Sequence, residues 1–484
     1  MRKFIRRLAI GGSFVALTGC SFDVVDSEST PGEEDVREVE QREVMTCPAP
    51  YNAQVGSVVY DKELVINNLA VVNDVCRTVW NTADPSCTTP SANSKWTFWF
   101  LMTQMAGTNN VSRFVLKWLE SFEEKPIVNG QELAARTKIR NFVIDPWRQV
   151  SGCVIGKKYD EAGGACSLDP AKAPFRLDAI VNRLDLRTGS YGGPAGEGRF
   201  VFNFVNLASN AGDGKPAPLQ AAVIFEYKLP TTTWLTSTWG QKWRALGGFS
   251  LFDASYRNAL QAITDKFSLA GTMPGAANNG SPISQVRTND LIFDPNGSKV
   301  WSLREFKLGC LPGQACGAND KFLIPTTVAQ TPANSKNNTA DLQNYINANA
   351  TSILNGSHSV PLTFNGTSFL GAESTSGPLF VGPFKWMTPA YNPAVDADKR
   401  RLFAISTCNG CHYAETETNN MHIFPRNHSM PANLSPFLSS PVTITSDPSG
   451  NMYDYDEPLR RKCELLHAAA GNDIPLTTST GRPH

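Results

Sequence analysis

Cys408 and Cys411, with His412 directly after them, are the residues of this chain whose types and spacing most clearly predict chemistry. They form a Cys-x-x-Cys-His motif, in which each thiol can add to one vinyl group of a haem while the adjacent imidazole binds its iron. A chain of 484 residues with 11 Cys and 6 His rarely contains this motif by chance. The motif therefore predicts one covalently attached haem c. A disulfide between Cys408 and Cys411, or a bound metal ion, remains as an alternative interpretation.

The start of the chain is typical of an export signal. Basic residues come first, and an apolar run from Leu8 to Leu17 follows that is too short to span a bilayer as a helix. The run ends in Leu17-Thr18-Gly19-Cys20, which resembles the bacterial lipoprotein box, where a signal peptidase cuts before the cysteine and lipid is added to it. This resemblance implies a signal peptide over residues 1–19 and lipidation of Cys20. A plain secretory signal is the alternative.

We therefore expect an exported protein that is lipid-anchored to the bacterial cell envelope, with the outer membrane, on its periplasmic or surface side, as the expected location. Residues 20–46 would link the anchor to the rest of the chain. They contain nine acidic residues between Asp23 and Glu43 and almost no aromatic side chain. Such a segment cannot bury enough apolar surface to offset the entropy of ordering it, so we predict a flexible acidic tether.

Eight cysteines remain once Cys20, Cys408 and Cys411 are set aside, and an even number suits an oxidising compartment with up to four disulfides. Short separations favour three pairs that close surface loops, and the two cysteines left over would tie the ends of the mature domain together. The predicted pairs are Cys76–Cys87, Cys153–Cys166, Cys310–Cys316 and Cys47–Cys463.

Residues 47–390 are predicted to form one large α+β domain, whose role the sequence does not indicate. Hydrophobic residues make up 41% of the chain, enough for a sizeable core, and helical and strand-like patterns mingle without a regular βαβ alternation. The predicted strands are 176–186, 198–206, 221–228 and 300–307, and the predicted helices include 96–105, 111–122, 131–142, 239–267 and 342–353.

The formal net charge is zero, with 44 basic and 44 acidic residues. Outside the signal, no run of Lys and Arg offers an electrostatic footprint for a phosphate backbone, so we expect no nucleic-acid partner.

Residues 391–484 are predicted to form a second, small and mainly helical domain. A helix through Arg400 and Ile405 would carry Cys408, Cys411 and His412 on one face, and a terminal helix would begin at Pro458. This region resembles the small c-type cytochromes, in which a helix leads into Cys-x-x-Cys-His and a terminal helix packs across it. The whole chain is similar to uncharacterised exported lipoproteins of Gram-negative bacteria that join a large domain to one such motif, a resemblance that implies no activity.

The sequence offers several candidates for the sixth iron ligand. We favour His422, because the run from Met421 to Arg426 supplies a ligand, apolar shielding and, in Arg426, a cation that could meet a haem propionate. Met452 is the runner-up, since it precedes the terminal helix as the methionine ligand does in the cytochromes that this region resembles. An open or water-bound sixth position is the third possibility.

Arg183, Asp185 and Arg187 alternate along a predicted strand and would therefore share one of its faces. They could bind an anion or the haem propionates, or they could neutralise one another as a ladder of ion pairs. We expect the ladder, because charges in sheets are usually paired with their neighbours.

Together these features predict a membrane-anchored haem c lipoprotein that transfers electrons outside the cytoplasm to or from a redox partner protein. Two alternatives stay open. One is a haem oxidoreductase whose open sixth position binds a small substrate. The other is a surface lipoprotein that binds a partner or polymer and uses Cys408 and Cys411 as a disulfide. The sequence does not decide whether the protein is an enzyme.

Overall fold

An eight-stranded antiparallel sheet forms the centre of the fold, in a computed structural model that describes residues 46–80, 87, 93–187, 194–297, 300–376, 384–445 and 450–476. The predicted signal peptide and lipidation site, and almost all of the predicted tether, lie outside the described residues. The strand order is β1-β4-β5-β6-β7-β8-β12, with β9 also paired to β8. The strands are β1 (Val65–Ile66), β4 (Phe175–Arg183), β5 (Glu197–Asn210), β6 (Pro216–Lys228), β7 (Ile283–Asp290), β8 (Ser302–Gly309), β9 (Phe322–Thr326) and β12 (Ser374–Thr375).

The two faces of the sheet differ in chemistry, because alternate residues of a strand point to opposite sides. In β5, Phe200, Phe202 and Phe204 enter the main hydrophobic core, whereas Arg199 and Val201 lie on the other face. The same alternation in the neighbouring strands leaves one face apolar and gives the other a set of buried arginines and carboxylates.

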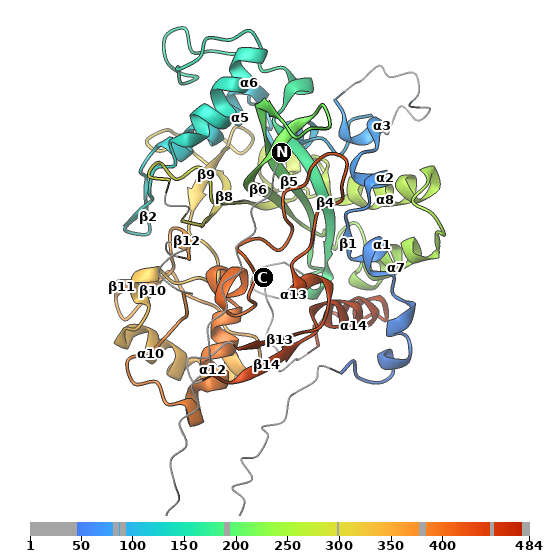
Figure 1. The fold of residues 1–484 in the computed structure, drawn as a ribbon, viewed down its shortest axis with the longest axis vertical. Helices are drawn as coiled ribbons and strands as arrows, with labels where there is room; N and C mark the ends of the chain where they lie inside the picture. The colour runs from blue at the N-terminus through green and yellow to red at the C-terminus, as the bar shows by residue number, and fades with distance from the viewer. Residues whose placement is uncertain are drawn as a thin grey trace, which may run out of the picture. The chain divides into compact units, whose positions relative to one another are not determined.

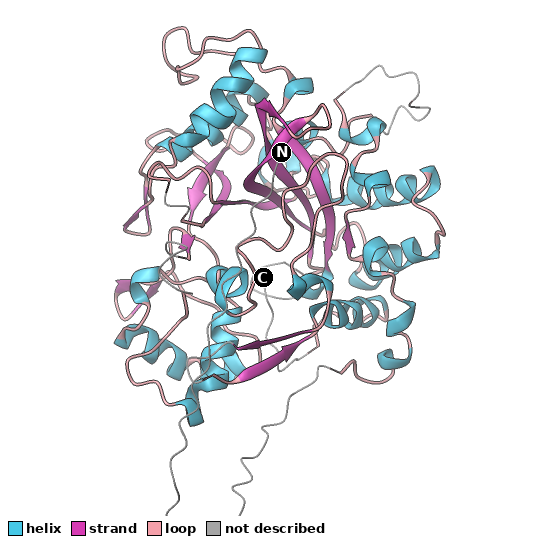
Figure 2. Cartoon of the chain, in the orientation of Figure 1, coloured by secondary structure: helices cyan, strands magenta, loops and turns pink. Residues whose placement is uncertain are grey.

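Helices cover the apolar face and fill the core with tryptophan and phenylalanine side chains (Figure 2). The helices of this part are α1 (Tyr60–Glu63), α2 (Leu69–Val72), α3 (Val75–Thr78), α4 (Phe98–Met105), α5 (Val111–Glu120), α6 (Asp145–Val150), α7 (Thr236–Ala245), α8 (Ala254–Ser268) and the short turn α9 (Ala277–Gly280). The small hairpin β2 (Ile127–Val128) and β3 (Gln131–Glu132) lies at its edge.

The C-terminal part of the chain covers the charged face of the sheet (Figure 1). Its helices are α10 (Ala340–Ala348), α11 (Ala350–Leu354), α12 (Pro393–Ile405), α13 (Pro436–Ser439) and α14 (Glu457–Ala469). Two hairpins accompany them, made of β10 (Thr363–Phe364) with β11 (Thr367–Ser368) and of β13 (Val442–Thr445) with β14 (Met452–Tyr455).

The mixture of helix and sheet agrees with the predicted α+β class, but a separate mainly helical domain from residue 391 is not confirmed. Glu43–His484 form one compact unit. Helix α14 packs against α7 and puts Leu465 and Leu466 into the main core. The C-terminal segment also contains the β13–β14 hairpin, so it is not purely helical.

All four predicted disulfides are present, with Cα–Cα distances of 5.6 Å for Cys47–Cys463, 5.4 Å for Cys76–Cys87, 5.6 Å for Cys153–Cys166 and 5.4 Å for Cys310–Cys316. These bonds are compatible with an exported, non-cytoplasmic protein. Among the described residues no helix is both long and apolar enough to cross a bilayer.

Three of the predicted elements are wrong in extent or type. Strand β4 ends at Arg183, because Leu184–Leu186 form a 3-10 turn whose first amide donates to the Asn182 side chain. The predicted helix 239–267 is broken between α7 and α8, where a Cβ on Gly247 would lie 2.0 Å from Glu63 Oε1. The predicted helix 131–142 begins instead with strand β3, and a π-helical turn follows at Arg140–Ile144.

His358 is buried in a second hydrophobic cluster that packs around α10 and α12. Its ring lies 6.1 Å from that of Phe403, and neither ring nitrogen has a hydrogen-bond partner among the described residues. Burial lowers the pKa of His358 from 6.5 to about 4. The folded protein therefore keeps this imidazole neutral at pH values where the unfolded chain protonates it.

Because the folded chain protonates His358 at lower pH than the unfolded chain does, we expect His358 to lower the stability of the folded protein in mild acid. As pH falls below about 6.5, protonation favours the unfolded chain, and the effect stops growing near pH 4. We therefore compare the free energy of unfolding of His358→Leu with that of the unaltered protein. The difference between them should favour the variant by about 2 kcal/mol more at pH 5 than at pH 7.5. Urea titrations of both proteins at the two pH values measure this difference. An equal gap at both pH values would contradict it.

Candidate functional site

Helix α12 delivers the chain to the Cys-x-x-Cys-His motif. At its start, the Asn392 side chain accepts a hydrogen bond from the amide of Ala394. Pro393 is the first helical residue, a position where a backbone N–H would have no partner within the helix. The helix ends at Ile405, and a π-helical turn follows at Gly410–Ala414. Cys408 and Asn409 are themselves helical and lead directly into this turn, so one short helical segment carries the motif, and only the expected continuity with α12 is broken, at Ser406 and Thr407.

Gly410 allows the motif to fold back against α12. A Cβ at this position would lie only 1.9 Å from the carbonyl oxygen of Ala404, so any larger residue would push the turn away from the helix. A buried ion pair of 2.6 Å between Arg400 and Glu415 closes the same turn from its far end. The indole of Trp386 donates to Thr407 Oγ1, 2.9 Å away, and reinforces the turn.

Both cysteines of the motif are buried free thiols, 4% and 2% exposed, and no disulfide joins them. Cys411 lines a cavity beneath the sheet, whereas Cys408 packs in an apolar cluster with Trp301 and Leu303. Burial raises the pKa of each thiol above its ordinary value. Both are therefore protonated at neutral pH, and the disulfide alternative is not the state of this structure.

His412 is held in an orientation that leaves one ring nitrogen available. Its Nδ1 lies 3.1 Å from the carbonyl oxygen of Asn420. A carbonyl can only accept, so Nδ1 carries the proton and Nε2 keeps its lone pair. Metal-binding histidines commonly show this arrangement, with the second nitrogen donating to a backbone carbonyl. Trp301 stacks on the same imidazole at a centroid distance of 5.3 Å and an interplanar angle of 25°.

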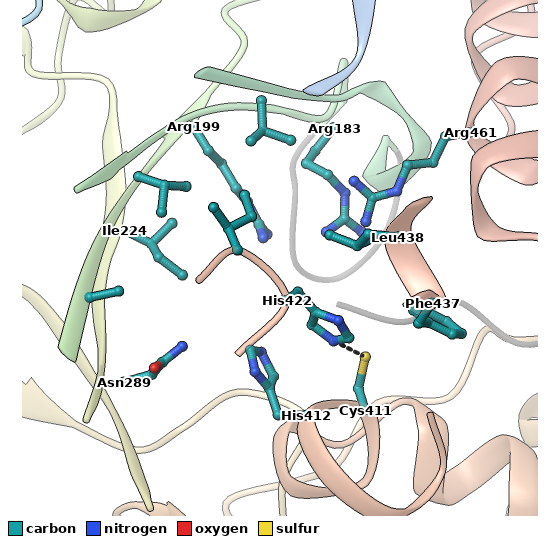
Figure 3. Close-up of a pocket in the computed structure, with 14 residues that line it drawn as sticks. Arg183, Arg199, Ile224, Asn289, Cys411, His412, His422, Phe437, Leu438 and Arg461 are labelled. Carbon is teal, nitrogen blue, oxygen red and sulfur yellow. Dashed lines mark hydrogen bonds between the residues drawn. The ribbon is translucent and has the colours of Figure 1, made fainter. Parts of the chain in front are cut away.

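His422 faces His412 and Cys411 (Figure 3). Its Nε2 lies 3.3 Å from Cys411 Sγ, and its ring centroid lies 4.7 Å from that of His412. On its other side, Nδ1 lies 2.9 Å from the Ser435 hydroxyl. Burial lowers the pKa of His412 to about 4 and lowers that of His422 well below its ordinary value. Both imidazoles are therefore neutral at pH 7, the form that binds a metal.

The cavity that these residues border lies between the charged face of the sheet and the C-terminal segment. It measures about 70 Å³, well below the roughly 300–1,000 Å³ typical of small-molecule sites, so a ligand of ordinary size requires the segments around it to stand farther apart. Its apolar walls come from strands β4, β5 and β6 and from helix α13 with the segment before it. The apolar residues are Val181, Val201, Ala222, Ile224, Ile423, Phe437 and Leu438.

Among the described residues that line this cavity, three arginines are the charged side chains and none is a carboxylate. Each is paired with a carboxylate: Arg183 with Asp185 at 2.9 Å, Arg199 with Glu197 at 2.6 Å, and Arg461 with Glu457 at 2.6 Å. Burial lowers the pKa of Arg183 to about 10, so the guanidinium still carries its charge at pH 7. The pairing of Arg183 with Asp185 thus agrees with the expected ion pairs, while the guanidinium groups rather than their carboxylate partners line the cavity.

Arg187 belongs to a different contact from the one its sequence position predicts. It lies beyond the end of β4, and its guanidinium pairs with Glu464 of α14 at 2.9 Å. It therefore ties α14 to the sheet and does not share a strand face with Arg183.

The residues present fit a covalently attached haem in their chemistry. The cavity brings together a buried thiol, an imidazole with a free Nε2, a second imidazole, apolar walls and cationic side chains. The fit in space is tighter. Two metal–nitrogen bonds of about 2 Å each, with half a ring at either end, exceed the 4.7 Å between the two imidazole centres. An iron ligated by both His412 and His422 therefore requires the segment that carries His422 to stand farther from the motif.

Two residues predicted for this site lie elsewhere. The guanidinium of Arg426 is buried against Asp178 at 3.5 Å and donates to the carbonyls of Val72 and Leu177, so it does not line the cavity. Met452 lies in β14 with 51% of its side chain exposed and is also absent from the cavity wall.

Sequence reasoning missed Trp301, Asn420 and Arg461, which contact His412 or line the cavity. Trp301 precedes β8 and is far from the motif in sequence, and no local pattern indicates that it stacks on the imidazole. The sequence indicates Arg461 only weakly. It follows Glu457 at the i, i+4 spacing of a helical ion pair.

Comparison with known proteins assigns no role to this site, so its geometry is the evidence for its function. No protein-family model, no curated protein and no solved structure matches the chain. Within the described ranges, no group of three or more His, Cys, Asp or Glu side chains could hold a metal ion. A haem iron needs only one or two protein ligands, so this result bears on isolated metal ions rather than on haem.

Proposed function

We propose that the protein is an exported c-type haem lipoprotein that transfers electrons, with one haem attached to Cys408 and Cys411. The observation that carries the proposal is the geometry of His412. Its Nδ1 is occupied by the Asn420 carbonyl, which leaves Nε2 free, and its ring lies 4.7 Å from the neutral imidazole of His422, whose Nε2 contacts the buried Cys411 thiol. Free buried cysteines in a chain whose other described cysteines all form disulfides also support the proposal.

The attachment chemistry needs no oxidant. The thiols of Cys408 and Cys411 would hold the haem by adding across its vinyl C=C bonds, with a C–S bond formed on one carbon and the hydrogen going to the other. The thiols of Cys408 and Cys411 must be reduced for this addition, as they are here. Haem, when bound, supplies an iron centre that accepts and returns one electron.

The residues around the cavity have complementary roles in the proposal. His412 serves as the proximal ligand, and Asn420 and Trp301 fix the plane of its ring. Arg183 and Arg199 offer cations to the propionates in place of Arg426, the residue predicted from the sequence. The apolar walls exclude water, and burial together with nearby charge tunes the reduction potential of such a centre.

His422 favours electron transfer over catalysis at an open iron site. It is the one residue among the predicted sixth ligands that lies at the cavity beside His412. The Ser435 hydroxyl holds its Nδ1 and leaves Nε2 directed at Cys411 and the cavity. If His412 and His422 both held the iron, no substrate could bind there, so a redox partner protein would be the source or acceptor of the electron.

The proposed location is the bacterial envelope, with lipid on Cys20 and the acidic segment 20–46 as a spacer. The four disulfides support export. A single cysteine carrying several acyl chains would hold the protein to a membrane surface, because each buried methylene contributes about 0.8 kcal/mol. The protein should therefore sediment with envelope membranes, and Cys20→Ser should release it to the soluble fraction. A Cys20→Ser protein that stays fully membrane-bound would contradict the anchor.

Haem attachment is tested by expressing the full chain with and without a cytochrome c maturation system. Staining of denaturing gels for haem should be positive only with that system, and Cys408→Ala or Cys411→Ala should each weaken it strongly, because each removes one thioether. His428→Gln, which alters a histidine outside the cavity, is the matched control and should stain normally. Tryptic peptides of matured protein that carry Cys408 and Cys411 at unmodified mass would refute the attachment.

The sixth ligand is tested by near-infrared magnetic circular dichroism of the oxidised protein. We expect the charge-transfer band of two imidazole ligands in the unaltered protein and in Met452→Leu. His422→Ala should shift or abolish that band and open the iron to added cyanide or imidazole. A methionine-type band that disappears in Met452→Leu and persists in His422→Ala would contradict the assignment.

A further inference from the structure

A second cavity lies outside the proposed haem site, at the opposite end of β4. It opens between α2 and α3 on one side and the start of β4, the middle of β5 and the start of β6 on the other. It measures about 490 Å³. None of the residues proposed to hold the haem lines it.

The walls of this second cavity are apolar and partly open to water. Val75 and Val79 are 55% and 49% exposed. Deeper in the wall, Phe98 and Phe175 stack face to face at a centroid distance of 3.6 Å. Apolar surface gathered in a concave site, rather than scattered singly, is typical of a site for the apolar part of a ligand.

The ionisable residues that line this cavity are all basic. They are Lys172, Arg176, Lys215 and His428, and none of the described residues that line the cavity carries a carboxylate. The guanidinium of Arg176 is fixed by the carbonyls of Arg426 and Pro216, at 2.8 and 2.6 Å. Two acidic groups outside the wall, Asp178 and then Asp213, act on the charge of Arg176, and Asp213 also acts on His428. The wall therefore presents fixed positive charge beside apolar surface.

We propose that the second cavity binds an amphipathic carboxylate, a molecule with an aliphatic or aromatic body and one carboxylate end. The body would lie along Phe175 and Val79, and the carboxylate would pair with Arg176 and Lys215. A guanidinium matches a carboxylate with two parallel hydrogen bonds, and a partly buried pair is stronger than an exposed one. This proposal does not depend on haem, because no residue of the motif takes part.

One segment of the chain borders both cavities. His422 borders the first cavity and His428 borders the second. Between them, Arg426 donates to Asn73 Oδ1 at 2.7 Å, and Asn73 itself lines the second cavity. A ligand in the second cavity thus contacts the same segment that closes the first.

Isothermal titration of the full chain with decanoate, decanol and 2-naphthoate tests the proposal. Decanoate should bind at one site and about tenfold more tightly than decanol, because decanol lacks the charge that Arg176 and Lys215 recognise. Relative binding of decanoate and 2-naphthoate distinguishes an aliphatic from an aromatic body. No saturable binding of either carboxylate, or equal affinity for decanoate and decanol, would overturn the proposal.

Variants locate the binding in this cavity. Lys215→Gln should weaken decanoate several-fold, and Val79→Glu should weaken it more, because it places a negative charge in the wall. Both residues are exposed, so neither change should unfold the chain. Lys266→Gln, an exposed lysine outside the cavity, is the matched control and should bind normally. Equal binding by all three variants would refute the site.

The same titrations on the Cys408→Ala/Cys411→Ala protein separate this proposal from the proposed haem function. Decanoate affinity should be unchanged when haem cannot attach. Loss of haem staining with intact decanoate binding would leave the second cavity standing, and intact staining without decanoate binding would overturn the second cavity alone.

Discussion

Arg460 of helix α14 joins the C-terminal segment to the end of the sheet, and the site depends on this contact. Its guanidinium lies 2.7 Å from Asp185 and 2.6 Å from Glu457, with all three side chains almost fully buried. A charge that is removed from water in this way must be paired, and breaking one member of a buried pair commonly costs about 3–5 kcal/mol. Burial opposes the charge on Arg460, but the two carboxylates raise its pKa well above the ordinary value. The pairing therefore fixes where α14 begins, and it places Arg461 beside Arg183 in the cavity wall.

A second buried pair fixes the other side of the cavity. Arg426 reaches Asp178 and the carbonyls around β4 and α2 with several donors at once. Burial raises the pKa of Asp178, and Arg426 acts against that rise. The sequence suggested that Arg426 would meet a propionate, whereas its contacts make it an anchor for the segment that carries His422. The two histidines are thus brought together by ion pairs that lie outside the cavity itself.

The sequence predicts well those features of the fold that neighbouring residues determine. The strands predicted at 198–206 and 221–228, the helix predicted at 111–122 and the cysteine pairs of short separation all depend on neighbouring residues, and the structure places β5, β6, α5 and these disulfides there. The pair Cys47–Cys463 followed by elimination, although 416 residues separate its members. The errors arise where a distant group decides the conformation. The break at Gly247 follows from the close approach of Glu63, and the loss of an independent C-terminal domain follows from the packing of α14 on α7.

In the candidate site, too, neighbouring residues determine some features and distant residues determine others. The identity of Cys408, Cys411 and His412 could be read from five consecutive letters, because that motif is local. The neighbours that orient them could not, since Trp301 precedes the motif by more than a hundred residues and Asn420 contacts His412 through its backbone. The size of the large domain was the feature that fitted an electron carrier least, because a carrier needs little more than the motif and its helices. Its strands β4, β5, β6 and β7 supply one wall of the cavity, while the motif and its neighbours supply the other. The sheet is therefore part of the candidate site, and a C-terminal fragment cut at residue 391 would leave His412 and His422 without that wall.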